Sequence, residues 1–378
     1  MNYVQLKDVC VINMGQSPDS NSYNDCGEGL PFFQGNADFG EMYPVTRKWC
    51  SSPTKIASEN DILISVRAPI GALNYAKESC CIGRGLAALT PNKSKVSPAF
   101  IFWLLKSKNE ELNSKGTGST FKAIGRKVLE ETLIPNISLG EQIVCAKALE
   151  KIYYIMQTCQ QQLQKLDELV KARFVEMFGD PVTNPMDWPT KPLLEMGYCK
   201  NGMNFHTGDS GIEMHCLGVG DFKDYSVIDG TDYLPTISLN EAPPEESMLQ
   251  DGDLVFVRSN GNKALVGRCL LVYPHNTPTT YSGFCIRYRL TSAEVNIAYL
   301  LRVLKTDSMR KKMAGRGANI QNLNQQILAA LNIPTPPLEL QEWFTAFIEQ
   351  IDKSKVAVQK SLDEAQLLFD SLMQHYFG

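Results

Sequence analysis

A long internal repeat restricts the fold of this 378-residue chain more than any other feature of its sequence. Residues 116–135 read GTGSTFKAIGRKVLEETLIP, and residues 315–334, 199 positions later, read GRGANIQNLNQQILAALNIP with no gap. The same offset relates FIFWLLKS (100–107) to YLLRVLKT (299–306). Because self-similarity over such a distance is typical of tandem structural units, we expect two copies of one architecture.

The offset between the copies shrinks toward their starts. NDILISVRAPIG (60–71) corresponds to GDLVFVRSNG (252–261), and PFFQGNADF (31–39) corresponds to MHCLGVGDF (214–222). Loops of unequal length would produce this change, and they leave the repeat intact.

Local patterns predict the same elements in both copies. The β-branched runs DILISV and DLVFVR predict short strands, and the apolar spacing near 97–113 and 293–313 predicts helices. Each copy is therefore expected to form a mixed domain of helices and mostly non-parallel strands.

A segment of about 40 residues follows each domain and carries apolar residues at heptad spacing, which is typical of a coiled-coil seam. In the first segment the two apolar series are Leu149, Met156, Leu163, Val170, Met177 and Cys145, Ile152, Cys159, Leu166. In the second they are Ile351, Val358, Ala365, Leu372 and Ile348, Leu362, Phe369, Tyr376, with Lys355 as an interruption. Amphipathic helices packed only on their own domains are the alternative.

The repeat favours an antiparallel pair of helices, because each copy then makes equivalent contacts. The predicted fold class is α+β, with two repeated mixed α/β domains separated by an antiparallel coiled coil of two long helices. The predicted boundaries are 1–137 and 180–337 for the domains, and 138–179 and 338–378 for the helices. Such a chain would hold two similar domains apart, which suits a ligand with two related sites, such as duplex DNA.

Composition restricts the class of protein. The net charge is −4, which at first argues against a nucleic-acid partner, although residues 1–137 carry +2 and residues 338–378 carry −4. No run approaches 18 consecutive apolar residues, and the start lacks the pattern of a signal peptide, so we expect a cytoplasmic protein without membrane contact. The eleven scattered cysteines are expected to be reduced, and with four histidines they match no zinc-ligand spacing.

Polar positions change between the copies while glycines and apolar positions are kept. Thr117, Ser119, Thr120, Lys122, Ala123, Gly125, Arg126 and Lys127 become Arg316, Ala318, Asn319, Gln321, Asn322, Asn324, Gln325 and Gln326. Asn and Gln pair bidentately with adenine, and Arg and Lys with guanine. This pattern indicates that the two copies share one scaffold but carry different polar residues on its surface.

Basic residues also cluster at the same place in both copies, at 106–127 and 302–316, where phosphate contacts are their natural use. The alignment also places Arg67 on Arg258 at matched strand ends. Solvated helix faces and structural turns are the alternatives for all of these residues. The predicted DNA-binding set is Gln34, Asn36, Arg67, Lys115, Thr117, Ser119, Thr120, Lys122, Arg126, Arg258, Asn260, Arg310, Lys312, Arg316, Asn319, Gln321 and Asn322.

Motifs for catalysis or cofactor binding are missing from the sequence. The GxG pairs at 116 and 315 lack the third glycine and the later acidic residue of a dinucleotide-binding loop. NPMDW (184–188) lacks the second proline of an amino-methyltransferase motif. We therefore predict no catalytic residue, no cofactor site and no metal site in this chain.

Taken together, the chain resembles the specificity subunit of type I restriction-modification systems over essentially its whole length. The resemblance is carried by the domain starts LKDVCVINMGQSP and KPLLEMGYCKNG, the helix entries IPNISLGEQ and IPTPPLELQ, the two long helices, and the linker MFGDPVTNPMDWP. It implies that each domain reads one half of a split DNA sequence and that the helices set the gap. It also implies docking of two methyltransferase subunits, which bind adenosylmethionine and modify adenine, with restriction subunits as further partners.

Because of its acidic charge, the isolated chain is expected to bind DNA poorly without its partners. The competing interpretation is a non-catalytic scaffold whose repeated domains bind two proteins. A self-contained adenine methyltransferase is disfavoured, since cofactor and catalytic motifs are missing. The target bases, the gap length and the presence of a nuclease subunit are not determined by the sequence.

Overall fold

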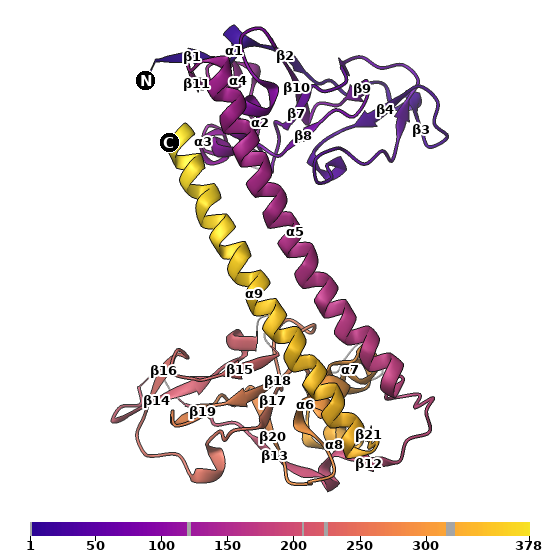
Figure 1. The fold of residues 1–378 in the computed structure, drawn as a ribbon, viewed down its shortest axis with the longest axis vertical. Helices are drawn as coiled ribbons and strands as arrows, with labels where there is room; N and C mark the ends of the chain where they lie inside the picture. The colour runs from indigo at the N-terminus through magenta and orange to yellow at the C-terminus, as the bar shows by residue number, and fades with distance from the viewer. Residues whose placement is uncertain (1, 119–121, 206–207, 223–225, 315–321) are drawn as a thin grey trace. The chain divides into compact units, whose positions relative to one another are not determined.

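The computed structural model describes residues 2–118, 122–205, 208–222, 226–314 and 322–378 (Figure 1). Contacts divide the chain into two compact units: unit 1 is Met1–Gln162 with Val358–Gly378, and unit 2 is Leu163–Ala357. Each unit therefore contains one mixed domain, called domain 1 or domain 2, and parts of both long helices. The domain boundaries taken from the sequence stay a prediction, since the units cut through those helices.

A four-stranded sheet, a five-stranded sheet and short helices form domain 1. The strands are β1 (Tyr3–Gln5), β2 (Cys10–Met14), β3 (Tyr23–Asn24), β4 (Leu30–Phe33), β5 (Trp49–Cys50), β6 (Ile56–Ala57), β7 (Ile62–Ser65), β8 (Leu73–Tyr75), β9 (Cys80–Ile82), β10 (Leu86–Pro91) and β11 (Leu133–Pro135). The short helices are α1 (Leu6–Val9), α2 (Pro98–Ser107), α3 (Asn109–Ser114) and α4 (Arg126–Glu130). The sheet orders are β2-β10-β7-β8 and β3-β5-β4-β9-β6, and β1 pairs with β11.

Domain 2 repeats this arrangement with local changes. Its strands are β12 (Thr190–Pro192), β13 (Gly197–Asn201), β14 (Ile212–Leu217), β15 (Val227–Asp229), β16 (Thr236–Leu239), β17 (Asp253–Val257), β18 (Cys269–Tyr273), β19 (Thr279–Tyr281), β20 (Cys285–Leu290) and β21 (Asn332–Pro334). Its short helices are α6 (Ile297–Lys305), α7 (Asp307–Ala314) and α8 (Gln325–Ala329). Its two larger sheets have the strand orders β13-β20-β17-β18-β15 and β16-β14-β19, and β12 pairs with β21 as β1 pairs with β11 in domain 1.

The predicted strands and helices are confirmed. β7 and β17 carry the two β-branched runs, and both have every side chain buried between neighbouring strands. The pairs β4–β9, β14–β19 and β15–β18 are parallel, whereas the other ladders of the described strands are antiparallel. The expectation of mixed domains with mostly non-parallel strands is therefore correct.

Two 40-residue helices follow the domains, α5 (Leu139–Phe178) and α9 (Leu338–Phe377). Unit 1 contains the start of α5 and the end of α9, and unit 2 contains the end of α5 and the start of α9. Because these opposite ends pack together in each unit, the two helices pair antiparallel, as the repeat predicted (Figure 1).

In unit 1 the predicted seam forms one apolar cluster with the core of domain 1. Leu149, Ile152 and Met156 of α5 belong to the same cluster as Phe369 and Phe377 of α9. The Phe369 ring lies 5.6 Å from that of Trp103 on α2, and the Phe377 ring lies 5.3 Å from that of Phe100. The last turns of α9 therefore complete the core of a domain from the other copy.

Unit 2 has the reciprocal arrangement. Phe174 and Phe178, near the end of α5, share a cluster with Phe344 of α9 and Tyr299 of α6. The Phe178 ring lies 4.8 Å from that of Tyr299 and 5.3 Å from that of Phe344. Lys355, the interruption in the seam, reaches Asp167 of the other helix at 2.5 Å. Packing of each helix on its own domain alone is thus excluded.

A glutamine near the start of each long helix ties that helix to its domain. Gln341 Oε1 accepts a hydrogen bond from Asn296 N at 2.9 Å, and its Nε2 donates to Pro336 O at 2.7 Å. The equivalent Gln142 accepts from Ser97 N at 2.9 Å and donates to Ile137 O at 2.9 Å. The glutamine that ends both helix-entry motifs is therefore a buried structural anchor.

Replacing Gln341 with Ala should destabilise the protein, because it leaves buried backbone groups unsatisfied at about 1–3 kcal/mol each. Chemical unfolding of the Gln341→Ala variant should show this loss. The matched control is Gln350→Ala on the same helix, where the side chain is exposed and the change should stay within about 0.5 kcal/mol. Equal stability of the two variants would contradict the anchor.

Candidate functional site

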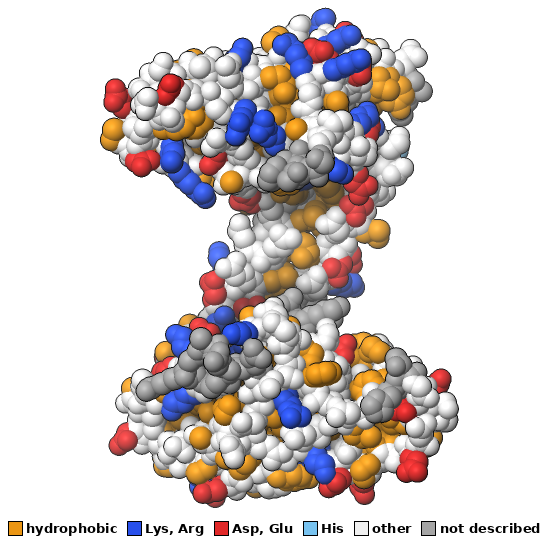
Figure 2. All heavy atoms as spheres, turned by 180° about the vertical axis from the view of Figure 1, so that it is seen from behind, with side chains coloured by type: hydrophobic (Ala, Val, Ile, Leu, Met, Phe, Trp, Pro, Cys, Tyr) orange, Lys and Arg blue, Asp and Glu red, His pale blue; other side chains and the backbone are white. Residues whose placement is uncertain are grey.

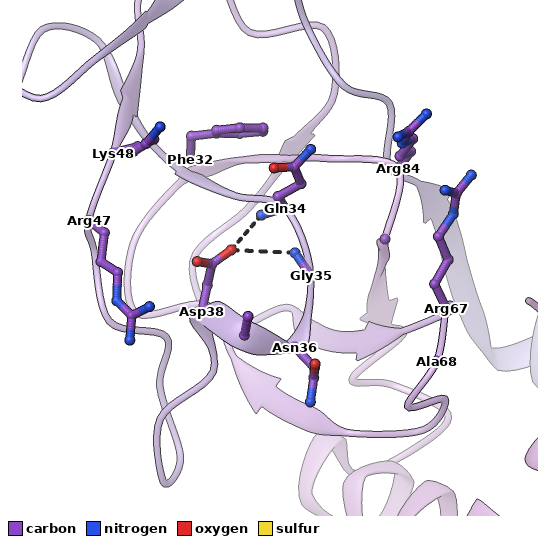
Figure 3. A pocket seen from close by; sticks show the side chains of 12 residues that line it. Phe32, Gln34, Gly35, Asn36, Asp38, Arg47, Lys48, Arg67, Ala68 and Arg84 are labelled. Carbon is purple, nitrogen blue, oxygen red and sulfur yellow. Dashed lines mark hydrogen bonds between the residues drawn. The ribbon is translucent and has the colours of Figure 1, made fainter. Parts of the chain in front are cut away.

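A concave pocket of about 500 Å³ lies in domain 1 (Figure 3). We call it the first pocket; it is lined by Phe32, Gln34, Gly35, Asn36, Ala37, Asp38, Arg47, Lys48, Arg67, Ala68, Arg84 and Gly85. The structure thus brings together Gln34, Asn36 and Arg67, which the sequence predicted as DNA-binding. It adds three basic residues that the prediction missed: Arg47, Lys48 and Arg84.

Close backbone contacts fix the position of Arg84. Gly83 N donates to Phe33 O at 2.8 Å, and Gly85 N donates to Gln34 O at 3.1 Å. A Cβ atom on Gly85 would lie 2.3 Å from Gln34 O, so a larger residue cannot replace this glycine without moving the backbone. The turn that carries Arg84 is therefore pressed against the loop that carries Gln34.

Arg67 lies two residues after the end of β7, and its backbone runs between two other segments. Val66 N donates to Gly85 O at 2.9 Å, and Ile124 N donates to Val66 O at 2.9 Å. Arg67 forms an isolated bridge with Ala123. The backbone at Val66 and Arg67 is thus held on one side by the Arg84 turn and on the other by Ala123 and Ile124 of the 116–135 repeat segment.

The first pocket is rich in cations. Arg67 and Arg84 lie on one side of it and Arg47 and Lys48 on the other, with Gln34 between them (Figure 3). No hydrogen bond or ion pair joins these four basic side chains to any residue that the structure describes. The carboxylate of Asp38 instead accepts from the backbone nitrogens of Gln34 at 2.7 Å and Gly35 at 3.4 Å. An anionic or acceptor-rich ligand suits this lining.

Other predicted basic residues of domain 1 are paired within their own helix. Lys115 Nζ lies 2.6 Å from Glu111 Oε1, and Arg126 Nε lies 2.8 Å from Glu130 Oε1. The hydrogen bond from Lys115 is the main cause that holds the pKa of Glu111 below its usual value. These exposed pairs match the solvated-face alternative.

The rest of that segment borders the first pocket only in part. Thr117 and Lys122 are exposed, and Ala68 N donates to Lys122 O at 3.1 Å, so Lys122 lies next to the lining. Ser119 and Thr120 lie outside the described residues. Their DNA-binding role stays a prediction.

A second pocket, of about 470 Å³, lies in domain 2. It is lined by Val219, Ser259, Asn260, Gly261, Phe284 and Asn322. Asn260 and Asn322 belong to the predicted set, whereas Ser259 and Phe284 do not. In the part of the chain that the structure describes, this lining contains no charged side chain.

The two pockets occupy the same place in the repeated scaffold. Gly83 N donates to Phe33 O, and Ser282 N, 199 positions later, donates to Leu217 O at 3.0 Å. Phe33 and Leu217 also hold matching places in the parallel ladders β4–β9 and β14–β19. The residues that follow these two, and the turns that follow Gly83 and Ser282, are therefore structural equivalents.

The backbone pairing corrects two alignments made from the sequence. The alignment of residues 31–39 with 214–222 matched Gln34 with Leu217, whereas the parallel ladders match Phe33 with Leu217. Arg67 bridges Ala123, and Ser259 bridges Asn322, which lies 199 positions after Ala123. The counterpart of Arg67 is therefore Ser259, and Arg258 is one position earlier. The alignment was wrong because matching the two arginines required a one-residue gap that the strands do not contain.

Arg258 and the other predicted residues of domain 2 have varied environments. Arg258 Nη1 donates to Gly283 O at 3.3 Å, and Arg310 Nη2 donates to Ala264 O at 3.0 Å. Burial lowers the pKa of Arg310 from its usual value. Lys312 is exposed on α7. Arg316, Asn319 and Gln321 lie outside the described residues.

Exposed apolar side chains recur on the long helices at equivalent positions. In unit 1 they are Leu139, Val144 and Leu368, and in unit 2 they are Leu338, Trp343 and Leu169. We call these sets the apolar trios. Hydrophobic side chains are visible on the surface of the long helices (Figure 2). Val144 and Trp343, 199 positions apart, are 63% and 50% exposed, so equivalent positions of the two helices carry uncovered apolar side chains.

Cysteines, metal-ligating groups and long apolar helices are the remaining features that could indicate another kind of site. All eleven cysteines are free, and burial raises the pKa of the Cys80 thiol to about 12. Among the residues that the structure describes, no group of three or more His, Cys, Asp or Glu could hold a metal ion. Within the same described ranges, no helix has the length and apolar content to cross a bilayer.

Comparison with known proteins identifies the family. A family model described as the type I restriction modification DNA specificity domain matches residues 1–168 and 242–365. The chain belongs to the type I restriction-modification specificity family. The resemblance inferred from the sequence is thereby confirmed.

Individual specificity subunits are similar to this chain over different lengths. The MjaX specificity subunit of Methanocaldococcus jannaschii is 43% identical over 160 residues, which is 42% of this chain and 38% of that subunit. The StySPI specificity subunit of Salmonella potsdam is 24% identical over 367 residues, covering 90% of this chain and 78% of that subunit. The crystal structure of the type I S subunit from M. genitalium is 15% identical, covers 100% of this chain and 96% of that one, and shares its fold with a TM-score of 0.62.

Replacing Asp38 with Ala should loosen the loop of the first pocket without unfolding the domain. The Gln34 and Gly35 amides lose their acceptor, so their hydrogen exchange should accelerate by about fivefold to tenfold, equivalent to roughly 1–1.5 kcal/mol. Exchange measured residue by residue would test this. Asp25→Ala, at an exposed position of the same domain, is the control, and unchanged exchange at Gln34 in Asp38→Ala would disprove the role of Asp38.

Proposed function

We propose that this chain is the DNA-recognition subunit of a type I restriction-modification complex and that its two domains read the halves of a bipartite target. The observation that carries the proposal is the pair of equivalent pockets with different linings on one repeated scaffold. A ligand with two related but non-identical sites requires this combination. The family model is described as a DNA specificity domain, which supports double-stranded DNA as the ligand.

The pocket chemistry suits base recognition. Arginine reads guanine and asparagine reads adenine through paired hydrogen bonds, and both residue types line the pockets. Both linings come from loops at strand ends, which can change in sequence while the sheets keep their cores. Within a domain, the remaining exposed basic residues would contact phosphates, which fixes position without reading sequence.

The reaction itself would be carried out by partner subunits. Specificity subunits are generally non-catalytic, and we assign no catalytic residue and no cofactor to this chain. Adenosylmethionine would bind the methyltransferase partner. Restriction subunits are the further partners that the family implies.

The apolar trios are the candidate docking surfaces for methyltransferase subunits. Each unit carries one trio at equivalent positions of the helix pair, so the same partner surface can be used twice. Trp343 is the largest member, and it stacks in parallel on Phe347 and receives the Arg173 guanidinium at 4.6 Å from its ring. Rigid exposed aromatic groups of this kind often dominate binding energy. Two trios support two methyltransferase copies.

Exchange of domain 1 tests the proposed function. Residues 1–137 are replaced with the equivalent domain of a relative, the chain is expressed with its methyltransferase, and the methylated genome is sequenced. We expect one half of the methylated sequence to change and the other half to be kept, because each domain reads one half-site. Methylation that stays unchanged would favour a protein-binding scaffold instead.

Replacing Trp343 with Asp tests the docking surfaces. A charge in the trio of unit 2 should weaken one of the two methyltransferase sites by about 30-fold or more, equivalent to about 2 kcal/mol. Native mass spectrometry should then show a complex with one methyltransferase in place of two. Gln350→Ala on the same helix should keep two. If the Trp343→Asp variant still bound two methyltransferase subunits, the trio of unit 2 would not be part of the docking interface.

A further inference from the structure

Two guanidinium groups of the first pocket are held by rigid backbone and remain available to a ligand. Arg84 is carried by a turn whose backbone hydrogen bonds to Phe33 and Gln34 measure 2.8 and 3.1 Å. Arg67 follows a fully buried central strand. Neither side chain is hydrogen-bonded to a described residue, and both lie on the same side of the pocket (Figure 3). Their five-donor forks therefore face the ligand with little backbone freedom to lose.

The equivalent positions of domain 2 carry no charge. Ser259 replaces Arg67, and Gly283, 199 positions after Arg84, replaces that arginine. Gln34, which follows Phe33, is replaced by Gly218, which follows Leu217. In their place the second pocket has the amides of Asn260 and Asn322 and the ring of Phe284, which is 61% exposed.

This difference separates phosphate contacts from base contacts. The phosphate backbone is the same in both halves of a DNA target, so a position that binds phosphate in one domain has the same use in the other. Base edges differ between the halves, so a position that reads bases is free to change. Arg67 and Arg84 have no arginine at the equivalent positions of domain 2. The backbone bonds from Gly83 N to Phe33 O and from Val66 N to Gly85 O are nevertheless matched there, from Ser282 N to Leu217 O and from Arg258 N to Phe284 O, which is the pattern expected of base readers.

We propose that the two domains read their half-sites with different chemistry: Arg67 and Arg84 bind guanine in the half-site of unit 1, whereas Asn322 and Phe284 read bases in the half-site of unit 2. Guanine offers two major-groove acceptors, O6 and N7, that fit an arginine fork. Asn322 suits adenine, and the Phe284 ring suits a thymine methyl group. The inference rests on the proposed function and names the bases that it concerns.

The test uses the full chain co-expressed with its methyltransferase, with the methylated genome sequenced for each variant. Arg67→Ala and Arg84→Ala should make guanine positions degenerate in one half-site only, with discrimination falling by roughly fivefold to 150-fold per position. Arg84→Lys keeps the charge and loses the fork, so it should also relax guanine selection. Asn322→Ala should relax the other half-site. Lys93→Ala, exposed and outside both pockets, is the control that should leave the sequence unchanged.

Two results would overturn the inference while leaving the proposed function in place. One is a half-site of unit 1, assigned by domain exchange, that contains no guanine on either strand. The other is an Arg84→Ala variant that weakens binding equally at all DNA sequences and leaves the recognised sequence unchanged. In that case the slope of the logarithm of the binding constant against the logarithm of the salt concentration should fall by about one, as for the loss of one phosphate contact. If the unmodified chain directs no bipartite methylation at all, the proposed function fails, and the inference fails with it.

Discussion

The architecture depends on an exchange of core residues between the two copies. Phe377, at the end of α9, enters the cluster that contains Phe100 of domain 1, and Phe178, at the end of α5, enters the cluster that contains Tyr299 of domain 2. Each fully buried phenylalanine contributes about 1.5–3 kcal/mol. Because each domain receives its last aromatic residues from the helix of the other copy, neither copy has a complete core alone. The antiparallel pairing of the helices follows directly from this exchange.

Such an exchanged core separates the residues that hold the scaffold from those that meet a ligand. The buried glutamines Gln142 and Gln341 make the same two hydrogen bonds in both copies. At the start of the loops after β4 and β14, the strand ends keep one backbone bond to the neighbouring turn, from Gly83 N to Phe33 O and from Ser282 N to Leu217 O, although Gln34 is replaced by Gly218. Side chains that point from these loops into the pockets are therefore free to change while the domain keeps its stability.

The sequence predicted the periodic parts of the fold well and the pockets only in part. The helices were expected at 138–179 and 338–378, and α5 and α9 span Leu139–Phe178 and Leu338–Phe377, because heptads and missing prolines are local signals. Arg84 was missed because its place depends on the parallel pairing of β4 with β9, which lie about 50 residues apart. The alignment of Arg67 with Arg258 failed for a related reason. Matching two identical residues required a one-residue gap, and the strand register shows that this gap does not exist. The pairing of Lys115 with Glu111, in contrast, is an i,i+4 pattern that the sequence already contains.

The acidic net charge of −4 becomes understandable once the basic side chains are located. Lys106 lies 3.9 Å from the centroid of the Tyr153 ring, and burial lowers the pKa of that lysine, so it serves the helix packing. Arg310 donates to a backbone carbonyl, and Arg126 pairs with Glu130. These three side chains are therefore engaged within the protein and are not available for phosphates, whose contacts supply affinity that is independent of sequence. Partner subunits that bind the backbone would then supply the affinity, and this chain would supply the selection.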